Sequence, residues 1–572
     1  SSLLFNLNSA ETSKELQDAA QDISPLLVRL SNDITMNDNL FARIDALYRS
    51  GKDTGLTTEQ SMLLEKTHRN FTLGGAGLDP VHRKRFREIS EELSGLTLRF
   101  EANVLHETNA FELHITDESD LAGLPPDIVE TASAEAGKRE KEGWVFTLNQ
   151  PSYVPFMQFS DRRDLREKMF MAYGSRAFHG DGKDNSSLVL KIVNLRLEKA
   201  KLLGFENYAQ MILTDRMADT PLKVNSFLDR LHQASHKAAL RDFENLKTFA
   251  GENGLQDQFQ RWDWLYYSEK LKKARYNIDD EILRPYFSLD TTREAIFGLA
   301  TDLFSIRFAR NKEIPVYHEE VSAWEVFDIE GKIIAVLYLD HHPRKGKSGG
   351  AWMTSYREQR SEKGKRIIPH VSIVMNFTRP GPSKPSLLTF NELTTYLHEF
   401  GHALHAILSD CSYESLSGTN VARDFVELPS QFMENWAFEK EWLDRWAMHY
   451  ETGEKLSEEL IIRIREAAAF NEGYACNRQL GFGFLDMAWH TMTHPAGIPV
   501  DEFERKAMSA TELFQAAEGT NMSCSFTHLF GGDYAAGYYG YKWAEVLDAD
   551  AFYHFRDSGL FNRDVADSFR RN

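Results

Sequence analysis

The segment His398-Glu399-Phe400-Gly401-His402 constrains this chain more than any other part of its sequence. Histidines at positions i and i+4 lie one turn apart on the same face of an α-helix, so both imidazoles can reach one metal ion. Glu399 follows the first histidine and can take a proton from a water molecule held by that ion. The segment therefore predicts a helix with two ligands of a single Zn²⁺ and a general base, although two histidines can also fall at this spacing by chance.

A zinc site of this kind needs a third protein ligand and one open position. His405 shares the helix face, but at ~1.5 Å per residue it stands about 10 Å along the axis from His398, too far to share one ion. We expect His405 either to pack in the core or to contact a metal ligand without binding the ion itself. Position 408 is Leu408, which excludes the arrangement in which a third histidine follows six residues after the second.

Glu427 is the acidic residue that stands out downstream of the motif. Its neighbours in the sequence are apolar, and a bare carboxylate among them would be costly. Alternatively, Glu427 is the last member of a capping box that begins at Asp424. Glu434 lies seven residues beyond Glu427 on the same face, where it could orient a ligand histidine or be an ordinary helix carboxylate.

A run rich in glycine and tyrosine occupies residues 526–543 and contains one histidine, His528. No Gly-Lys-Ser/Thr sequence follows the glycines, so a phosphate-binding loop is not indicated. Phenol and imidazole groups on a flexible loop can donate hydrogen bonds to the oxyanion that forms when water attacks an amide. The alternative is a loop of aromatic residues that packs in the core.

The segment before the motif predicts a small β-sheet. Residues 324–339 read as a hairpin with Glu330-Gly331 at the turn, and residues 370–377 read as a third strand. A helix then opens near residues 389–392 and carries the motif. We expect a small antiparallel sheet beside this helix, to whose edge an extended peptide could hydrogen-bond.

The rest of the chain reads as helical. Apolar residues recur at three- and four-residue spacing across much of 1–120 and again across 161–250, so the predicted fold class is mainly α. We divide the chain into an N-terminal helical region at 1–150, a second helical region at 151–320 and a catalytic region at 321–572.

Charge and cysteine content bound the partners and the location. The formal net charge of −19 repels nucleic-acid phosphates and anionic lipid, so we expect neither nucleic acid nor a membrane as a partner. The three cysteines are far apart and form no Cys-x-x-Cys pair, and the N-terminus lacks a basic signal-like region. These features favour a cytoplasmic location, and a periplasmic one would require that a signal had been removed.

With these residues in hand, the chain resembles the thimet oligopeptidase/neurolysin family of zinc metallopeptidases, and within it the peptidyl-dipeptidase (dipeptidyl carboxypeptidase) branch of bacteria. The matching motifs cover nearly the whole chain, and together they are highly specific. They are Leu40–Ala46, Trp262–Trp264, Arg284–Phe287, Pro315–His318, Lys347–Met353, His398–His405, Leu416–Asn420, Asp424–Gln431 and Tyr534–Trp543.

The resemblance implies one Zn²⁺ ion held by His398, His402 and Glu427, with Glu399 as the general base. Glu434 falls on the family's carboxylate behind a ligand histidine.

The resemblance also implies roles for the tyrosine-rich run. Tyr541 matches the tyrosine that stabilises the tetrahedral intermediate, and His528, Tyr534 and Tyr538 match positions that contact substrate. The implied fold is an elongated helical body, the region 151–320 forming a wall of a deep central channel with zinc at its floor. Such a channel admits short unstructured peptides.

The expected activity is hydrolysis of short peptides by a monomer, with release of C-terminal dipeptides. One alternative is an endo-oligopeptidase with the same zinc chemistry, similar to oligopeptidase A; a more distant one is a peptide-binding protein without turnover. The chain departs from the family at Asp533, where a glycine usually precedes the tyrosine. Family members also generally extend beyond both ends of this sequence.

Overall fold

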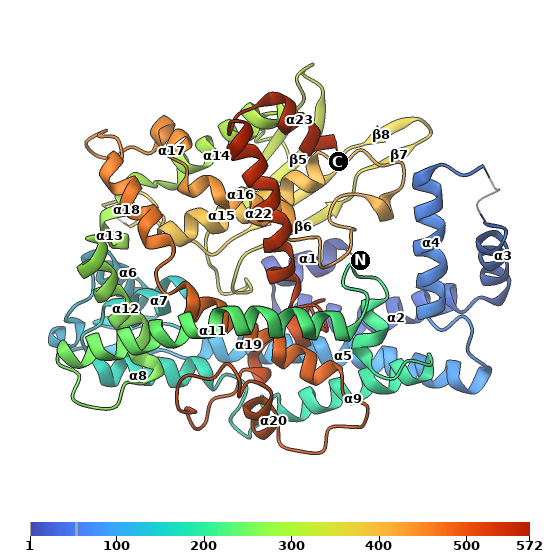
Figure 1. The fold of residues 1–572 in the computed structure, drawn as a ribbon, viewed down its shortest axis with the longest axis horizontal. Coiled ribbons are helices and arrows are strands. Elements are labelled where there is room, and N and C mark those ends of the chain that lie inside the picture. Colours follow the sequence, from blue (N-terminus) through green and yellow to red (C-terminus); the bar gives the residue numbers. More distant parts are fainter. Residues whose placement is uncertain (1, 52–54, 382, 572) are drawn as a thin grey trace.

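The structure is a computed structural model that describes residues 2–51, 55–381 and 383–571 (Figure 1). The ends of the first and third predicted regions, residues 1 and 572, lie outside the described residues. The chain is mainly helical, which confirms the expected class. The helices before the motif are α1 (Ser2–Ala10), α2 (Lys14–Thr35), α3 (Asp38–Arg49), α4 (Thr58–Leu73), α5 (Pro80–Ala110), α6 (Pro126–Lys138), α7 (Gln150–Phe159), α8 (Arg163–Gly174), α9 (Ser186–Leu202), α10 (Tyr208–Leu213), α11 (Pro221–Glu252), α12 (Arg261–Tyr276), α13 (Asp280–Leu283) and α14 (Leu289–Phe304).

The motif lies on α15, and further helices follow it to the end of the described chain. They are α15 (Phe390–Ile407), α16 (Leu428–Glu434), α17 (Lys440–Trp446), α18 (Glu458–Ala468), α19 (Glu472–His490), α20 (Val500–Ala507), α21 (Thr527–Phe530), α22 (Gly540–Ser558) and α23 (Arg563–Arg571).

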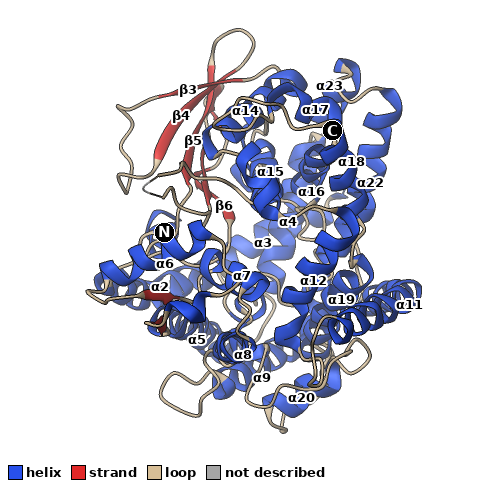
Figure 2. Cartoon of the chain, turned by 90° about the vertical axis from the view of Figure 1, so that its left-hand side faces the viewer, coloured by secondary structure: helices blue, strands red, loops and turns tan. Residues whose placement is uncertain are grey.

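The strands form one five-stranded sheet and two small two-stranded pairs. The larger sheet has the order β3-β4-β5-β9-β6, and Figure 2 shows it along one side of the molecule with α14 and α15 beside it. The strands are β1 (Leu113–Ile115), β2 (Trp144–Phe146), β3 (Arg307–Arg310), β4 (Ser322–Phe327), β5 (Ile333–Asp340), β6 (Trp352–Arg357), β7 (Arg360–Glu362), β8 (Lys365–Ile367) and β9 (His370–Val374).

The predicted hairpin is confirmed, because β4 and β5 pair in antiparallel fashion around a turn in which Gly331 has a φ of 84°. The predicted strand at 370–377 is present as β9. The expectation of an antiparallel sheet holds for three of the four strand pairings and is wrong for the pairing of β9 with β5. β9 runs parallel to β5, with Val336 opposite His370 and Asp340 opposite Val374. Residues 341–369 separate the two strands. Parallel neighbours need a long connection that returns to the same end of the sheet, and this segment is long enough, whereas a tight hairpin is not.

The helix that carries the motif begins where its capping residues predict. Thr389 Oγ1 accepts a hydrogen bond from the Glu392 backbone N–H at 3.0 Å, and Glu392 Oε2 accepts one from the Thr389 N–H at 2.8 Å. This reciprocal capping box satisfies backbone donors that the first helical turn would leave free. The other oxygen of Glu392 accepts from the Thr378 N–H at 2.7 Å, so the start of α15 is also tied to the segment that follows β9.

The main hydrophobic core joins α14, the large sheet, α15, α16 and α22. Tyr396 and Phe400 of α15 are fully buried in it, as is Trp436 just after α16. The start of the chain also reaches this sheet, since Asn6 of α1 accepts from Thr354 Oγ1 at 2.8 Å and donates to the Ser355 carbonyl at 3.1 Å. One face of α15 packs against the sheet, and another face contacts α16.

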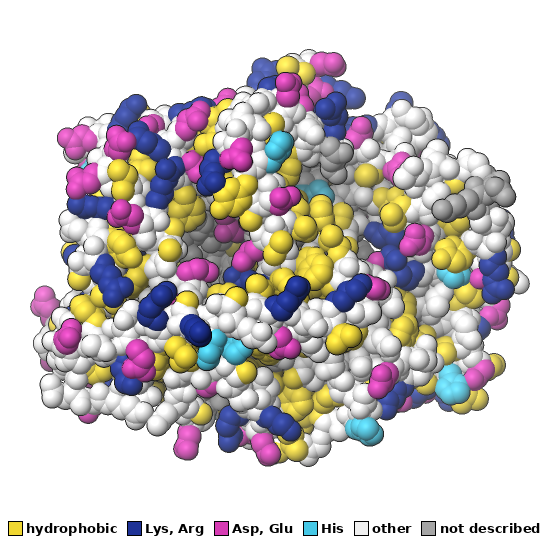
Figure 3. All heavy atoms as spheres, viewed as in Figure 1, with side chains coloured by type: hydrophobic (Ala, Val, Ile, Leu, Met, Phe, Trp, Pro, Cys, Tyr) yellow, Lys and Arg dark blue, Asp and Glu magenta, His cyan; other side chains and the backbone are white. Residues whose placement is uncertain are grey.

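The surface carries charges of both signs. On the face drawn in Figure 3, acidic and basic side chains are interspersed, with apolar side chains among them. Within 2–51, 55–381 and 383–571, no helix combines the length and the apolar character that crossing a membrane requires.

Helices α15 and α16 touch through Gly401. A Cβ atom at this position would lie 2.4 Å from the Pro429 carbonyl oxygen and 2.6 Å from the Ser430 Cα, both of which are backbone atoms. A side chain here would therefore push α16 away from α15.

We expect Gly401→Ala to lower the free energy of unfolding by about 1–3 kcal/mol, because overpacking forces backbone shifts. Gly95→Ala is the matched control: Gly95 also lies inside a helix, and its Cβ would meet no described atom within 4 Å. That change should instead stabilise the protein by roughly 0.5–1 kcal/mol, because alanine loses less backbone entropy in a helix. Thermal unfolding of both variants measures the difference, and equal effects would contradict the close contact at Gly401.

Candidate metal centre

Two turns of α15 present the motif side chains to the segment that precedes α16. His398 Nε2 lies 3.3 Å and His402 Nε2 lies 3.1 Å from the same oxygen of Glu427, Oε2. One ligand atom from each of the three residues lies within 4.8 Å of the others. The structure thus brings together the three side chains that the sequence suggested as ligands.

Glu427 is almost completely buried, with 1% of its surface exposed. Burial alone would raise the pKa of this carboxyl, but hydrogen bonds from His398 and His402 hold it well below its ordinary value. Ser430 Oγ donates a further hydrogen bond to Glu427 Oε2 at 3.0 Å. Because its oxygens face these polar partners, the carboxylate remains charged inside an apolar segment.

The alternative interpretation of Glu427, as part of a capping box opened by Asp424, is not what the structure contains. The Asp424 carboxylate accepts from the backbone N–H groups of Met217 and Ala218, at 3.0 and 2.9 Å. It also accepts from the Tyr539 hydroxyl at 2.8 Å. Asp424 therefore ties the segment before α16 to the connection between α10 and α11 and to the tyrosine-rich run.

Glu434 contacts His398 on the side of the ring that faces away from Glu427. Its Oε1 is 2.7 Å from His398 Nδ1, so Nδ1 can donate to Glu434 while Nε2 faces Glu427. Burial opposes a charge on His398, but Glu427 and Glu434 together hold the pKa of His398 well above its ordinary value. Of the two roles open to Glu434 in the sequence, the structure contains the hydrogen bond to a histidine.

Glu399 differs from Glu427 and Glu434 in having an oxygen that is both buried and without a hydrogen-bond partner among the described residues. Only 5% of its surface is exposed, and its Oε2 has no hydrogen-bond partner among the residues that the structure describes. Burial raises the pKa of Glu399. A buried carboxylate with an unused acceptor beside two histidines is suited to take up a proton.

His405 takes no part in the cluster. Its ring lies 6.4 Å from the ring of Phe425, and burial lowers its pKa to about 4. This agrees with the expectation that it is a packed histidine rather than a ligand.

The tyrosine-rich run folds over the same carboxylate. The Tyr534 hydroxyl donates a hydrogen bond to Glu427 Oε1. The rings of Tyr534 and Tyr541 stack at 5.2 Å with an angle of 7° between their planes, and Tyr538 lies 5.2 Å from Tyr541. His528 completes the group, 5.6 Å from Tyr534 and 5.7 Å from Tyr538. All four residues that the sequence singled out in this run therefore lie together.

Tyr541 lies in the first turn of α22, and Gln431 Nε2 of α16 donates to its backbone carbonyl at 3.1 Å. Burial raises the pKa of Tyr541 well above its ordinary value, and the neighbouring Tyr534 and Glu427 raise it further. Its hydroxyl is consequently a protonated hydrogen-bond donor at any ordinary pH.

Two residues beside this run were not predicted from the sequence. The Arg423 guanidinium lies 4.7 Å from the centre of the Tyr534 ring and pairs with Asp533 at 3.4 Å. The Asp533 side chain is 89% exposed, so the residue that departs from the family pattern points to the surface. Asp486 of α19 accepts hydrogen bonds from the backbone of the run, and its only signal in the sequence is an acid in an apolar stretch four residues before His490.

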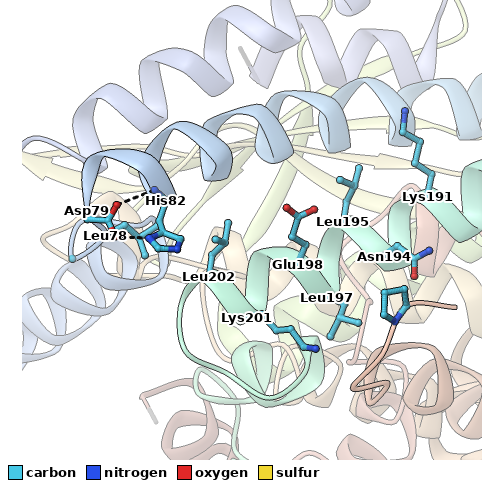
Figure 4. Close-up of a pocket in the computed structure, with 12 residues that line it drawn as sticks. Leu78, Asp79, His82, Lys191, Asn194, Leu195, Leu197, Glu198, Lys201 and Leu202 are labelled. Atoms are coloured by element: carbon cyan, nitrogen blue, oxygen red, sulfur yellow. Dashed lines mark hydrogen bonds and ion pairs between the residues drawn. The ribbon is translucent and has the colours of Figure 1, made fainter.

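A surface pocket of about 730 Å³ lies elsewhere, between the start of α5 and one face of α9. Figure 4 shows its acidic side chains, Asp79 at the start of α5 and Glu198 on α9. Asp79 is paired with His82, and Glu198 is paired with Arg85 at 2.6 Å. None of the predicted site residues lines this pocket, so it is separate from the metal centre.

A mainly helical fold in which two histidines and a buried glutamate converge beside a free carboxylate defines the class of helical metallopeptidases. Comparison with known proteins specifies this further: the chain belongs to peptidase family M3, whose model matches residues 156–572. The resemblance read from the sequence motifs is thereby confirmed.

Relatives of two different names match nearly the whole chain. A dipeptidyl carboxypeptidase of Salmonella typhimurium is 37% identical over 100% of this chain and 84% of its own length. Oligopeptidase A of Escherichia coli is 37% identical over 99% of this chain and 84% of its own length. An organellar oligopeptidase A of Arabidopsis thaliana is 38% identical over 98% of this chain and 72% of its own length.

Solved structures support the fold. A putative oligoendopeptidase F matches with a TM-score of 0.63 at 16% identity, over 99% of this chain and 82% of that one. PZ peptidase A with an inhibitor matches with a TM-score of 0.55 at 15% identity, over 97% of this chain and 80% of that one.

The hydrogen bond from His398 to Glu434 gives a test of the centre. We expect Glu434→Ala to weaken zinc binding by about 10–100-fold, because the carboxylate fixes the ring orientation and the tautomer of a ligand histidine. Competition with a fluorescent zinc chelator measures the affinity. Glu441→Ala is the control, since the Glu441 side chain is 56% exposed and pairs only with Arg445 among the described residues. Equal affinities in the two variants would contradict the role assigned to Glu434.

Proposed function

We propose that the protein is a zinc peptidase that hydrolyses short peptides and releases dipeptides from their C-termini. The observation that carries the proposal is the convergence of His398, His402 and Glu427 beside the unpartnered oxygen of Glu399. Two imidazole nitrogens and one carboxylate are a donor set typical of catalytic zinc, which leaves a fourth position open.

The residues present fit one zinc ion. His398 and His402 would hold it through Nε2, and Glu427 would hold it through a carboxylate oxygen that already faces both rings. When bound, zinc lowers the pKa of a water molecule towards ~7 and polarises the carbonyl group of the scissile bond.

Glu399 is the general base in this proposal. Its free oxygen accepts a proton from the attacking water, and the same carboxyl then gives a proton to the departing amine. Burial supports both steps, because a raised pKa brings the carboxyl nearer to the pH at which it must exchange protons.

Tyr541 stabilises the oxyanion. Its hydroxyl keeps its proton and can therefore donate a hydrogen bond to the negative charge that develops on the carbonyl oxygen. His528 and Tyr538 lie beside it, and we assign both to contact with the peptide. We assign Tyr534 the same role, since its ring stacks on Tyr541 and its hydroxyl donates to Glu427.

The length of the released product distinguishes two candidate functions. Relatives named dipeptidyl carboxypeptidase and relatives named oligopeptidase A match this chain at the same identity of 37%. The second candidate is therefore an endo-oligopeptidase that uses the same residues on internal bonds. In either case we propose that short peptides enter a deep channel and that the protein acts as a monomer in the cytoplasm.

We expect Glu399→Gln to keep its zinc and to lose about 10²–10⁴-fold in kcat, the range typical of a removed general acid–base group. Peptide turnover and metal content of the same preparation measure the two quantities. Full zinc content with unchanged, measurable peptide turnover would refute the role of Glu399. A wild-type protein that binds zinc and peptides without cleaving them would instead favour the peptide-binding alternative.

We expect a peptide with a free C-terminal carboxylate to lose successive dipeptides, and its C-terminal amide to be cleaved much more slowly. Mass spectrometry of the products identifies the bonds that are cut, and a chelator should abolish all cleavage. Equal cleavage of both peptides, or internal cuts alone, would contradict dipeptide release and support the endo-oligopeptidase.

A further inference from the structure

A fully buried carboxylate lies beneath the tyrosine-rich run. Asp486 of α19 has none of its surface exposed, and it accepts hydrogen bonds from three successive backbone N–H groups. These are the N–H groups of Ala536, at 2.7 Å, and of Gly537 and Tyr538, each at 2.9 Å. Successive N–H groups in a turn form a concave anion site, and here the anion is a side chain of the protein itself.

The turn that Asp486 holds is one that the backbone rarely adopts unaided. Ala536 has a φ of 54°, in the left-handed region that disfavours any residue with a Cβ. Gly531, Gly532 and Gly537 add conformational freedom on either side of it. The run therefore needs an external contact to keep one conformation.

His490 links this carboxylate to a second buried charge. Its Nδ1 lies 2.7 Å from Asp486 Oδ1, and its Nε2 lies 3.0 Å from Arg196 Nη1 of α9. A guanidinium can only donate, so Nε2 is the acceptor and the proton is on Nδ1. Burial lowers the pKa of His490, in agreement with a neutral ring between Asp486 and Arg196.

Arg196 reaches the other end of the run. The same Nη1 atom donates to the Leu529 carbonyl at 2.8 Å, in the short helix α21 that carries His528. Arg196 is 6% exposed, and its guanidinium lies 5.9 Å from the centre of the Phe530 ring. The chain Arg196–His490–Asp486 thus connects α21, before the glycines, with the turn just before α22.

We propose that Arg196, His490 and Asp486 are positioning residues for catalysis, and we call them the loop anchor. They act by holding His528 and Tyr541 at a fixed place relative to the metal centre. Tyr541 lies three residues after the last N–H group that Asp486 binds, so a displacement of that turn moves the start of α22. The inference rests on the proposed function, because it assigns Tyr541 a role in the reaction.

The first test measures the loop without reference to activity. In Asp486→Asn, the amide group retains one acceptor oxygen and directs an N–H group at the backbone donors. Hydrogen exchange followed by mass spectrometry should then show the amides of 529–541 exchanging at least about tenfold faster, since exchange reports local opening. Exchange in α15 and the zinc content should stay as in the wild type.

Asp263→Asn is the matched control. Asp263 is equally buried, but its partners are Arg163, Arg166 and the Gln260 N–H. We expect Asp263→Asn to leave exchange in 529–541 unchanged. Faster exchange there in this variant too would indicate a general loss of stability rather than a local effect of Asp486. His490→Ala, which leaves Asp486 in place, gives a second route to the same measurement if Asp486→Asn does not fold.

The second test is a double-mutant cycle on kcat. We expect Tyr541→Phe and Asp486→Asn each to lower kcat by at least about tenfold, with ~10³-fold, the upper end of what one oxyanion donor contributes, as the limit. In the Tyr541→Phe background, Asp486→Asn should cost less than about threefold more, because residues that act through one group are not additive.

Unchanged exchange in 529–541, or losses of kcat that multiply, would overturn the loop anchor. A zinc-loaded wild-type protein that cleaves no peptide would overturn the proposed function instead. The exchange comparison would still decide whether Asp486 holds the loop.

Discussion

The structure depends on one buried carboxylate. Glu427 is 1% exposed and has two histidine nitrogens, the Ser430 hydroxyl and the Tyr534 hydroxyl around its two oxygens. A charge so deeply buried is tolerable only when it is paired and hydrogen-bonded. Since its partners come from α15, α16 and the tyrosine-rich run, these segments must meet at one point. Because Gly401 has no side chain, α16 can pack closely enough against α15 for Glu427 to reach both histidines.

Three glutamates near this point have different environments, and the environments separate their roles. Glu427 is surrounded by donors and stays charged. Glu399 is equally hidden but has an unused oxygen, and burial raises its pKa. Glu434 is partly exposed and hydrogen-bonds the far side of a histidine ring. One residue type can thus supply the proposed ligand, the proposed base and an orienting group, because each carboxylate faces different neighbours.

The parts of this site that the sequence could predict are those encoded locally. The spacing of His398 and His402 and the capping pair Thr389 and Glu392 lie within one helix, and the hairpin turn at Gly331 lies between adjacent strands. The direction of β9 was predicted wrongly because it depends on how residues 341–369 cross the sheet. Asp486 was missed because its partners lie about fifty residues further on, at 536–538, and no local pattern marks a carboxylate that binds distant backbone.

The chemistry of the metal centre and the length of the released product depend on different groups. In the proposed function, the zinc ligands, the base and Tyr541 act on the atoms of one peptide bond, whichever bond of the substrate is presented. Relatives with both names match nearly the whole of this chain at 37% identity, so similarity to them does not separate the two outcomes. Dipeptide release requires in addition that the peptide stop two residues beyond the scissile bond, through donors that bind a terminal carboxylate. Such donors act on substrate position and leave the bond-breaking groups unchanged.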